Sequence, residues 1–168
     1  MGFLDFIDGA AKVLDFLDKI SGVSDSSSSA TLSKNDPDEL IEECEEYLLE
    51  FSTFSVDEVD EALNCLSRFE RRWLKLDRID SNCDDATLSG VISRLDSERD
   101  KALSKFEQEL QDVLDELSEA CKAENDPEKW QVLNDQWFKY MSESQKITNH
   151  KIKFLDKISS NALDFLNG

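Results

Sequence analysis

The chain has 168 residues and a formal net charge of −19, with 39% hydrophobic and 34% charged residues. Five glycines and two prolines are too few for a β protein with many turns, so the composition favours one all-α domain of long helices with solvated faces. The excess of carboxylates disfavours direct binding to nucleic acid or anionic lipid, because both contacts require clustered lysine and arginine.

Residues 1–21 predict an amphipathic helix of unusual width. On a helical wheel, the apolar side chains of residues 3–20 cover about twice the arc that an ordinary surface helix needs, and only Asp18 interrupts them. We therefore expect this helix to be held from two sides. The other charged residues crowd into an arc of roughly 80°, and they are Asp5, Asp8, Lys12, Asp15 and Lys19.

Three destinations for this helix stay open: the chain's own bundle, a partner or second copy of the chain, and a membrane surface. In a groove, its apolar anchors would be Phe3, Ile7, Leu14 and Leu17. A membrane is the least favoured destination, because the aspartates break any transmembrane run and interfacial helices usually carry Lys and Arg. The serine-rich residues 22–35 predict a flexible linker that tethers this helix to residues 36–168.

The two ends of the chain are similar in sequence. Residues 14–21 (LDFLDKIS) are similar to residues 153–159 (KFLDKIS), and residues 3–9 (FLDFIDG) to residues 162–168 (ALDFLNG). One interpretation is coincidence between segments rich in Leu, Phe and Asp. The other is that the two ends pair, or that both bind the same kind of surface.

Residues 36–168 predict an antiparallel helical bundle. Asp36 begins the first helix as its N-cap in an Asp-Pro start with a capping box, and Ser55 begins a second capping box. The chain therefore breaks near residues 52–55, and a new helix runs from Val56 to about Ile79. The expected core residues of these two helices are Leu40, Ile41, Cys44, Tyr47, Leu48, Phe51, Phe54, Val59, Ala62, Leu63, Leu66, Phe69, Trp73 and Leu76.

Two longer helices come next in the chain. A turn at residues 81–85 caps the first of them, and Asn125-Asp126-Pro127 restarts the chain for the second. Each has about 40 residues and a length near 60 Å, and the two shorter helices sum to a similar length. We therefore expect an elongated, coiled-coil-like antiparallel bundle of three rod lengths. The expected apolar faces are Leu88, Ile92, Leu95, Ala102, Phe106, Leu110, Val113, Leu117 and Cys121, then Trp130, Leu133, Trp137, Met141, Ile147, Leu155, Ile158, Ala162 and Phe165.

An acidic face is the main candidate binding site. From Asn35 to Ser67 there is no Lys or Arg, and like charges four residues apart on a helix destabilise it by about 0.2–0.5 kcal/mol per pair. A dock for a basic protein partner is one interpretation, and a solvated face is the other. The residues of this face, within an arc of roughly 100°, are Glu39, Glu42, Glu43, Glu46 and Glu50.

A basic stripe lies on the next helix. Its position near the helix C-terminus complements the helix dipole, and we expect its side chains to pair with acids of a neighbouring helix. The single histidine, His150, is expected to be a solvated surface residue. The stripe consists of Arg68, Arg71, Arg72, Lys75 and Arg78.

No motif for catalysis, a cofactor or a metal is recognisable, so we expect no enzyme and no cofactor. The cysteines Cys44, Cys65, Cys83 and Cys121 have no zinc-site spacing, and with no secretion signal visible they predict reduced thiols in the cytoplasm. We expect a non-enzymatic acidic protein that acts by protein–protein interaction, as inhibitors, immunity proteins or nucleic-acid mimics do. The alternative is a self-assembling scaffold or a membrane-surface protein that uses the N-terminal helix.

Overall fold

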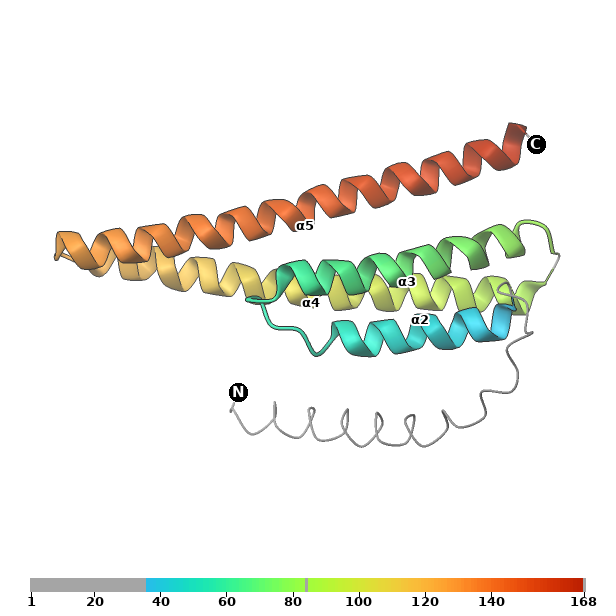
Figure 1. Ribbon diagram of the computed structural model, residues 1–168, viewed down its shortest axis with the longest axis horizontal. Helices are drawn as coiled ribbons and strands as arrows, with labels where there is room; N and C mark the ends of the chain where they lie inside the picture. The colour runs from blue at the N-terminus through green and yellow to red at the C-terminus, as the bar shows by residue number, and fades with distance from the viewer. Residues whose placement is uncertain (1–35, 84, 168) are drawn as a thin grey trace.

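The computed structural model describes residues 36–83 and 85–167, and this part of the chain is all-α (Figure 1). The helices are α2 (Pro37–Phe51), α3 (Val59–Asp80), α4 (Ala86–Ala123) and α5 (Pro127–Asn167). No strand occurs among these residues. The predicted N-terminal helix and linker, with Phe3, Ile7, Leu14 and Leu17, lie outside the described residues.

Three helices begin where the sequence predicts, at an aspartate that satisfies a free amide of the first turn. The Asp36 carboxylate accepts a hydrogen bond from the Asp38 amide at 3.0 Å. The Asp85 carboxylate accepts from Thr87 at 2.9 Å, and the Asp126 carboxylate accepts from Glu128 at 3.0 Å.

The start of α3 differs from the prediction by three residues. The Glu58 carboxylate does reach back to the Ser55 amide, at 2.9 Å, as a capping box requires. However, the Ser55 hydroxyl also points at this carboxylate, at 3.2 Å, and the Ser55 carbonyl accepts a bond from the Glu58 amide that closes a turn. The motif therefore stabilises a turn before the helix, and α3 begins at Val59 rather than Val56.

The arrangement of α2 and α3 corrects the expectation of three rod lengths. The two helices do not lie end to end; they form an antiparallel hairpin beside the first half of α4 (Figure 1). Both have an apolar face, and stacking end to end would leave each face with fewer neighbours. Since α5 runs back along α4, one end of the bundle contains all four of these helices and the other contains only α4 and α5.

The core consists of two clusters within the four-helix part. Trp73 lies in the first cluster, where its indole nitrogen donates to the Ile92 carbonyl at 3.1 Å and its ring meets Phe154 at 6.0 Å. Phe51 and Phe106 meet at 5.5 Å in the second cluster. The buried residues of the two clusters are Leu40, Cys44, Phe69, Trp73, Leu76, Leu88, Ile92, Leu95 and Phe154, then Phe51, Val59, Ala62, Cys65, Leu66, Leu103, Phe106, Leu110 and Ile147.

The apolar face of α5 is only partly buried, which corrects the predicted core of this helix. Among the α5 side chains that the structure describes, the buried hydrophobic ones are Ile147 and Phe154. Of the predicted face, Trp130, Met141, Leu155 and Ala162 are exposed. The periodicity of the sequence predicts which side of α5 is apolar. It does not predict that α3 and α4 cover only one edge of that side.

Candidate partner-binding surfaces

The acidic face of α2 is largely exposed. Glu39, Glu42, Glu46 and Glu50 lie in solvent, on the side of the helix away from the buried Leu40, Cys44 and Phe51. None of these four carboxylates has an ion-pair partner within residues 36–83 and 85–167. Partial burial raises the pKa of Glu46, and the neighbouring carboxylates Glu42 and Glu43 raise it further. The four glutamates thus form a compact anionic surface.

The fifth residue of the predicted face is already engaged. Glu43 is half-buried, and its carboxylate lies 2.7 Å from the Arg72 guanidinium of α3. On the opposite flank, Glu45 pairs with Arg94 of α4, also at 2.7 Å. These pairs hold α2 against its two neighbours and leave the other glutamates directed outward.

The basic stripe of α3 is paired only in part. Arg72 forms the predicted ion pair with an acid, while Arg78 donates to the Asn161 side-chain amide of α5 at 2.7 Å. Arg68, Arg71 and Lys75 are exposed, and no acid of the described residues pairs with them. The α2–α3 hairpin therefore presents an acidic surface on one helix and a basic surface on the next.

A buried ionic cluster, which the sequence did not predict, joins three helices. Glu70 of α3 and Arg99 of α4 are 2% and 5% exposed and form an ion pair in which Arg99 Nε, at 3.0 Å, and Arg99 Nη2 both donate to Glu70 Oε2. His150 Nε2 of α5 lies 2.7 Å from the other carboxylate oxygen. The expectation of a solvated His150 is wrong. Both carboxylate oxygens are occupied, so the cluster connects helices rather than presenting a free acid or base.

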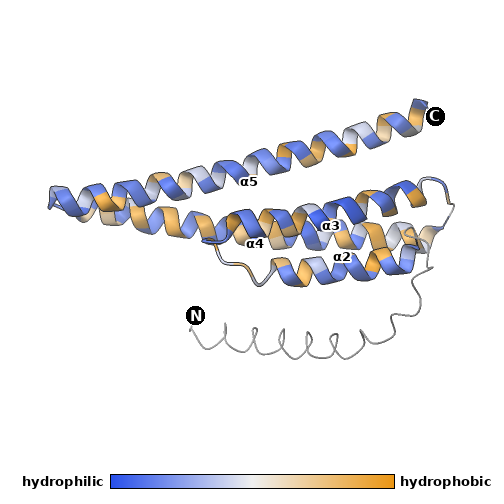
Figure 2. Ribbon diagram, viewed as in Figure 1, coloured by the Kyte–Doolittle hydropathy of each residue, from blue (hydrophilic) through white to orange (hydrophobic). Residues whose placement is uncertain are grey.

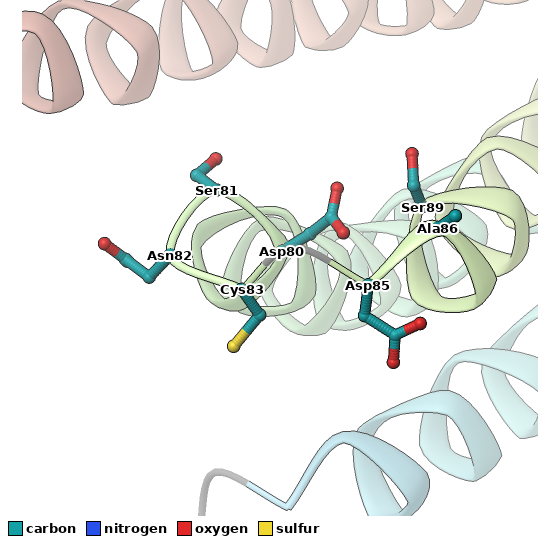
Figure 3. Close-up of a pocket in the computed structure, with 7 residues that line it drawn as sticks. All are labelled: Asp80, Ser81, Asn82, Cys83, Asp85, Ala86 and Ser89. Carbon is teal, nitrogen blue, oxygen red and sulfur yellow. The ribbon is translucent and has the colours of Figure 1, made fainter.

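The turn between α3 and α4 forms an open hollow of about 550 Å³. Its lining includes the carboxylates of Asp80 and Asp85 and the thiol of Cys83. Figure 3 shows these side chains pointing in different directions rather than toward a common centre. Across the described residues, no three His, Cys, Asp or Glu side chains are grouped as a metal site would require.

An uncharged surface with many exposed apolar side chains runs along α5. We define the α5 stripe as eleven residues in steps of three or four: Trp130, Asn134, Trp137, Met141, Ser144, Thr148, Ile152, Leu155, Ser159, Ala162 and Leu166. None is charged, although 34% of the chain is. From Thr148 onward every member is exposed, and Leu155 is 62% exposed. Figure 2 shows apolar residues along the whole length of α5.

A groove between α4 and α5 borders this stripe. One hollow of about 390 Å³ is lined by Leu103 of α4 and by Phe154, Leu155 and Ile158 of α5. A second, of about 400 Å³, continues it toward Ser144 and Thr148, and the two share Ser104, Glu107 and Lys151. Ser144, Thr148 and Leu155 of the α5 stripe thus line a groove that combines apolar side chains with charged ones of α4, among them Asp96, Asp100 and Glu107.

No described helix contains an apolar stretch of the length needed to cross a bilayer. Comparisons with protein-family models, with curated proteins and with solved structures gave no match. Function is therefore inferred from these surfaces alone.

Proposed function

We propose that this protein is a non-enzymatic binding protein that docks a basic protein partner on the acidic face of α2. The main support is the exposure of Glu39, Glu42, Glu46 and Glu50 side by side on one helix. Opposite charge on a partner would speed encounter and orient it. The proposal includes a cytoplasmic location and a tethered N-terminal helix.

The acidic face destabilises the helix that carries it. Its glutamates repeat at intervals of four, where each like-charge pair destabilises a helix by about 0.2–0.5 kcal/mol. The raised pKa of Glu46 reflects the same repulsion together with partial burial. A partner that supplied Lys or Arg between these carboxylates would relieve the repulsion, which a solvated face alone does not do.

The neighbouring basic stripe narrows the kind of partner. A uniformly basic surface would meet Arg68, Arg71 and Lys75 on α3 and be repelled by them. We therefore expect a partner with a basic patch that contacts α2 and, beside it, a neutral or acidic rim that contacts α3. An inhibitor or immunity-type protein, or a nucleic-acid mimic, would act in this way by covering the partner's basic site.

The test compares two triple charge reversals in the full chain. Glu42→Lys, Glu46→Lys and Glu50→Lys remove the acidic face, while Glu109→Lys, Asp112→Lys and Glu116→Lys make the same charge change on exposed positions of α4. Binding of a 20-residue peptide with lysines on one helical face and neutral residues on the other is measured by calorimetry at low and at physiological salt. We expect salt-sensitive binding to be lost in the first variant and kept in the second.

Equal loss in both variants would show that net charge, rather than the α2 surface, determines binding, and would overturn the proposal. Once the α2 and α4 variants are known to differ in peptide binding, the same two variants can identify the native partner by cross-linking in cells. The partner should be captured by the wild-type chain and the α4 variant, and not by the α2 variant.

Self-assembly is a second candidate, favoured by the exposed apolar residues of α5. A scaffold of this kind would use the N-terminal helix or the α5 stripe between copies. Light scattering would then give a mass above the 19.2 kDa of one chain. A membrane-surface role would instead appear as co-sedimentation with neutral liposomes, and lack of binding to any liposome would remove it.

A further inference from the structure

The second half of the α5 stripe lacks a cover within the described residues. Ile152 and Leu155 of the stripe are more than half exposed, as is Leu163 beside it, and Leu166 is 77% exposed. Of these, Leu155 lines the groove that also contains Leu103 and Phe154, while Leu166 lines a hollow against Asp77 and Arg78 of α3. Contiguous apolar surface on a soluble protein usually marks a place where another element binds.

We propose that residues 3–20 of the same chain bind here as a helix, between the α5 stripe and the adjoining face of α4. The width of the apolar arc in residues 3–20 requires contacts on two sides, and a groove between two helices supplies them. The lengths also agree. Eighteen helical residues span about 27 Å, as does the exposed stretch of α5 from Thr148 to Leu166, of which the part up to Ile158 lines the groove with α4.

The connection between the two segments is long enough. The chain enters α2 at the end of the bundle where α5 terminates (Figure 1). A flexible linker of the length of residues 22–35 has a root-mean-square span of about 21 Å. Neighbouring helix axes lie about 8–10 Å apart, so this span crosses two helices. The tether therefore keeps residues 3–20 at high local concentration near the groove.

Charge favours this occupant over a second copy of α5. Residues 3–20 contain four Asp and two Lys. Residues 145–167 of α5 reverse that balance, with Lys146, Lys151, Lys153 and Lys157 against Asp156 and Asp164. In a chain of net charge −19 this is a locally basic segment, and it would repel its own copy. Lys146 and Lys151 already pair with acids of the bundle, so within the described residues Lys153 and Lys157 are the lysines of this segment that can attract the acidic N-terminal segment.

The groove is a different surface from the acidic face of α2. Failure of the proposal for the groove would therefore leave the proposal for α2 untouched, and the reverse also holds. Binding of residues 3–20 in the groove covers Leu155 and Ile152 and leaves Glu42 and Glu46 exposed. It would also keep the anchors Phe3, Ile7, Leu14 and Leu17 away from other partners.

The first experiment measures thiol modification in the full-length chain. Leu155→Cys is treated with a maleimide, and modification is quantified by peptide mass spectrometry so that the exposed Cys83 serves as an internal reference. The same cysteine is then measured with Ile7→Asp and Leu14→Asp present. We expect modification at position 155 to become about tenfold faster in the second protein, because its cover opens. Leu49→Cys, on the outer side of α2, is the matched control and should not change.

Equal rates at position 155 with and without the two aspartates would overturn the proposal. Protection of the cysteine at position 155 that disappears on dilution of the protein would also overturn the proposal, because a second copy of the chain would then be covering this position. The reciprocal measurement avoids any doubt about folding, since it changes only exposed residues of α5. Hydrogen exchange of residues 3–20 should become about tenfold faster in Ile152→Asp with Leu155→Asp, and unchanged exchange would contradict the inference.

Discussion

The guanidinium carbon of Arg99 lies 4.1 Å from the centre of the Phe154 ring, inside the bundle. The same guanidinium pairs with Glu70, so one side chain of α4 contacts both α3 and α5. A planar arginine suits this position, because it can stack on a ring and donate in its own plane.

Replacing Arg99 with leucine should destabilise the protein strongly. The change leaves Glu70, which is 2% exposed, with only His150 beside it, and breaking a buried pair in this way usually lowers the free energy of unfolding by about 3–5 kcal/mol. Urea denaturation followed by circular dichroism measures the effect. Arg94→Leu, which removes two exposed ion pairs of the same helix, with Glu45 and Glu98, should lower stability by less than about 1 kcal/mol.

The double variant Arg99→Leu with Glu70→Leu should recover much of that loss, because no buried charge remains unpaired. If Arg99→Leu were no worse than Arg94→Leu, the pair would not be buried as described.

Asp96 gives stability a definite pH dependence. Burial raises its pKa, Asp100 raises it further, and Arg99 opposes the shift in part. Because the folded-state pKa is above the unfolded one, the folded protein binds the proton more tightly, and this group's contribution to stability is lost as pH rises between the two values. Asp96→Asn should therefore stabilise the protein at pH 7, by less than about 1 kcal/mol since the group is partly solvated.

The advantage of Asp96→Asn should shrink as the pH is lowered toward about 4, near the ordinary pKa of Asp. Thermal unfolding at a series of pH values measures it, with Glu109→Gln on the exposed side of α4 as the control. An advantage that grew on acidification would have the wrong sign for this explanation.

The cysteines should separate into reactive and unreactive groups. Burial raises the pKa of Cys44 and of Cys65 from 9.0 to about 12, which lowers the thiolate fraction at pH 8 about a thousandfold. Cys83 is exposed in the turn between α3 and α4. Iodoacetamide at pH 8 should modify Cys83 and leave Cys44 and Cys65 intact until urea is added, as peptide mass spectrometry would show. Early modification of Cys44 would mean that α2 leaves the bundle readily.

The acidic face should be unfavourable for stability. Glu46→Lys replaces like-charge neighbours by opposite charges, so we expect the free energy of unfolding to rise by about 0.5–1 kcal/mol. Chemical denaturation at low salt measures the gain, which should fall as salt is added. Glu43→Lys is the contrasting variant, because it loses the pair with Arg72 and should destabilise. A loss of stability in Glu46→Lys would contradict the repulsion.

The sequence predicts the local features of this fold well and the tertiary ones only in part. The aspartates at positions 36, 85 and 126 act on amides two residues away, so their role can be recognised from neighbouring letters alone. The hairpin of α2 and α3 could not be predicted in that way. Whether the chain reverses at residues 52–58 depends on which pairing of the apolar faces of α2, α3 and α4 buries the most area. The helical wheel of a single helix does not contain that information.

The buried Arg99 escaped prediction for a related reason. It occupies a core position of α4 between Leu95 and Leu103, where an arginine is ordinarily expected to turn outward. Its partners Glu70 and His150 are far away in sequence, so no local pattern connects them. The acidic face was recognisable because all of its residues belong to one helix, although the pairing of Glu43 with Arg72 was not.

The unequal ends of the bundle have a consequence for how the molecule moves. Where α2 and α3 are present, opening α5 would break the Glu70 cluster and the contacts of Phe154 and Ile147 together. Beyond them, fewer apolar side chains join the two remaining helices: Leu114 is buried, and Leu117, Leu133 and Trp137 are half-buried. We therefore expect this distal arm to open and re-close more readily than the four-helix end of the bundle. A ligand of the arm would therefore select from conformations that the free protein already visits.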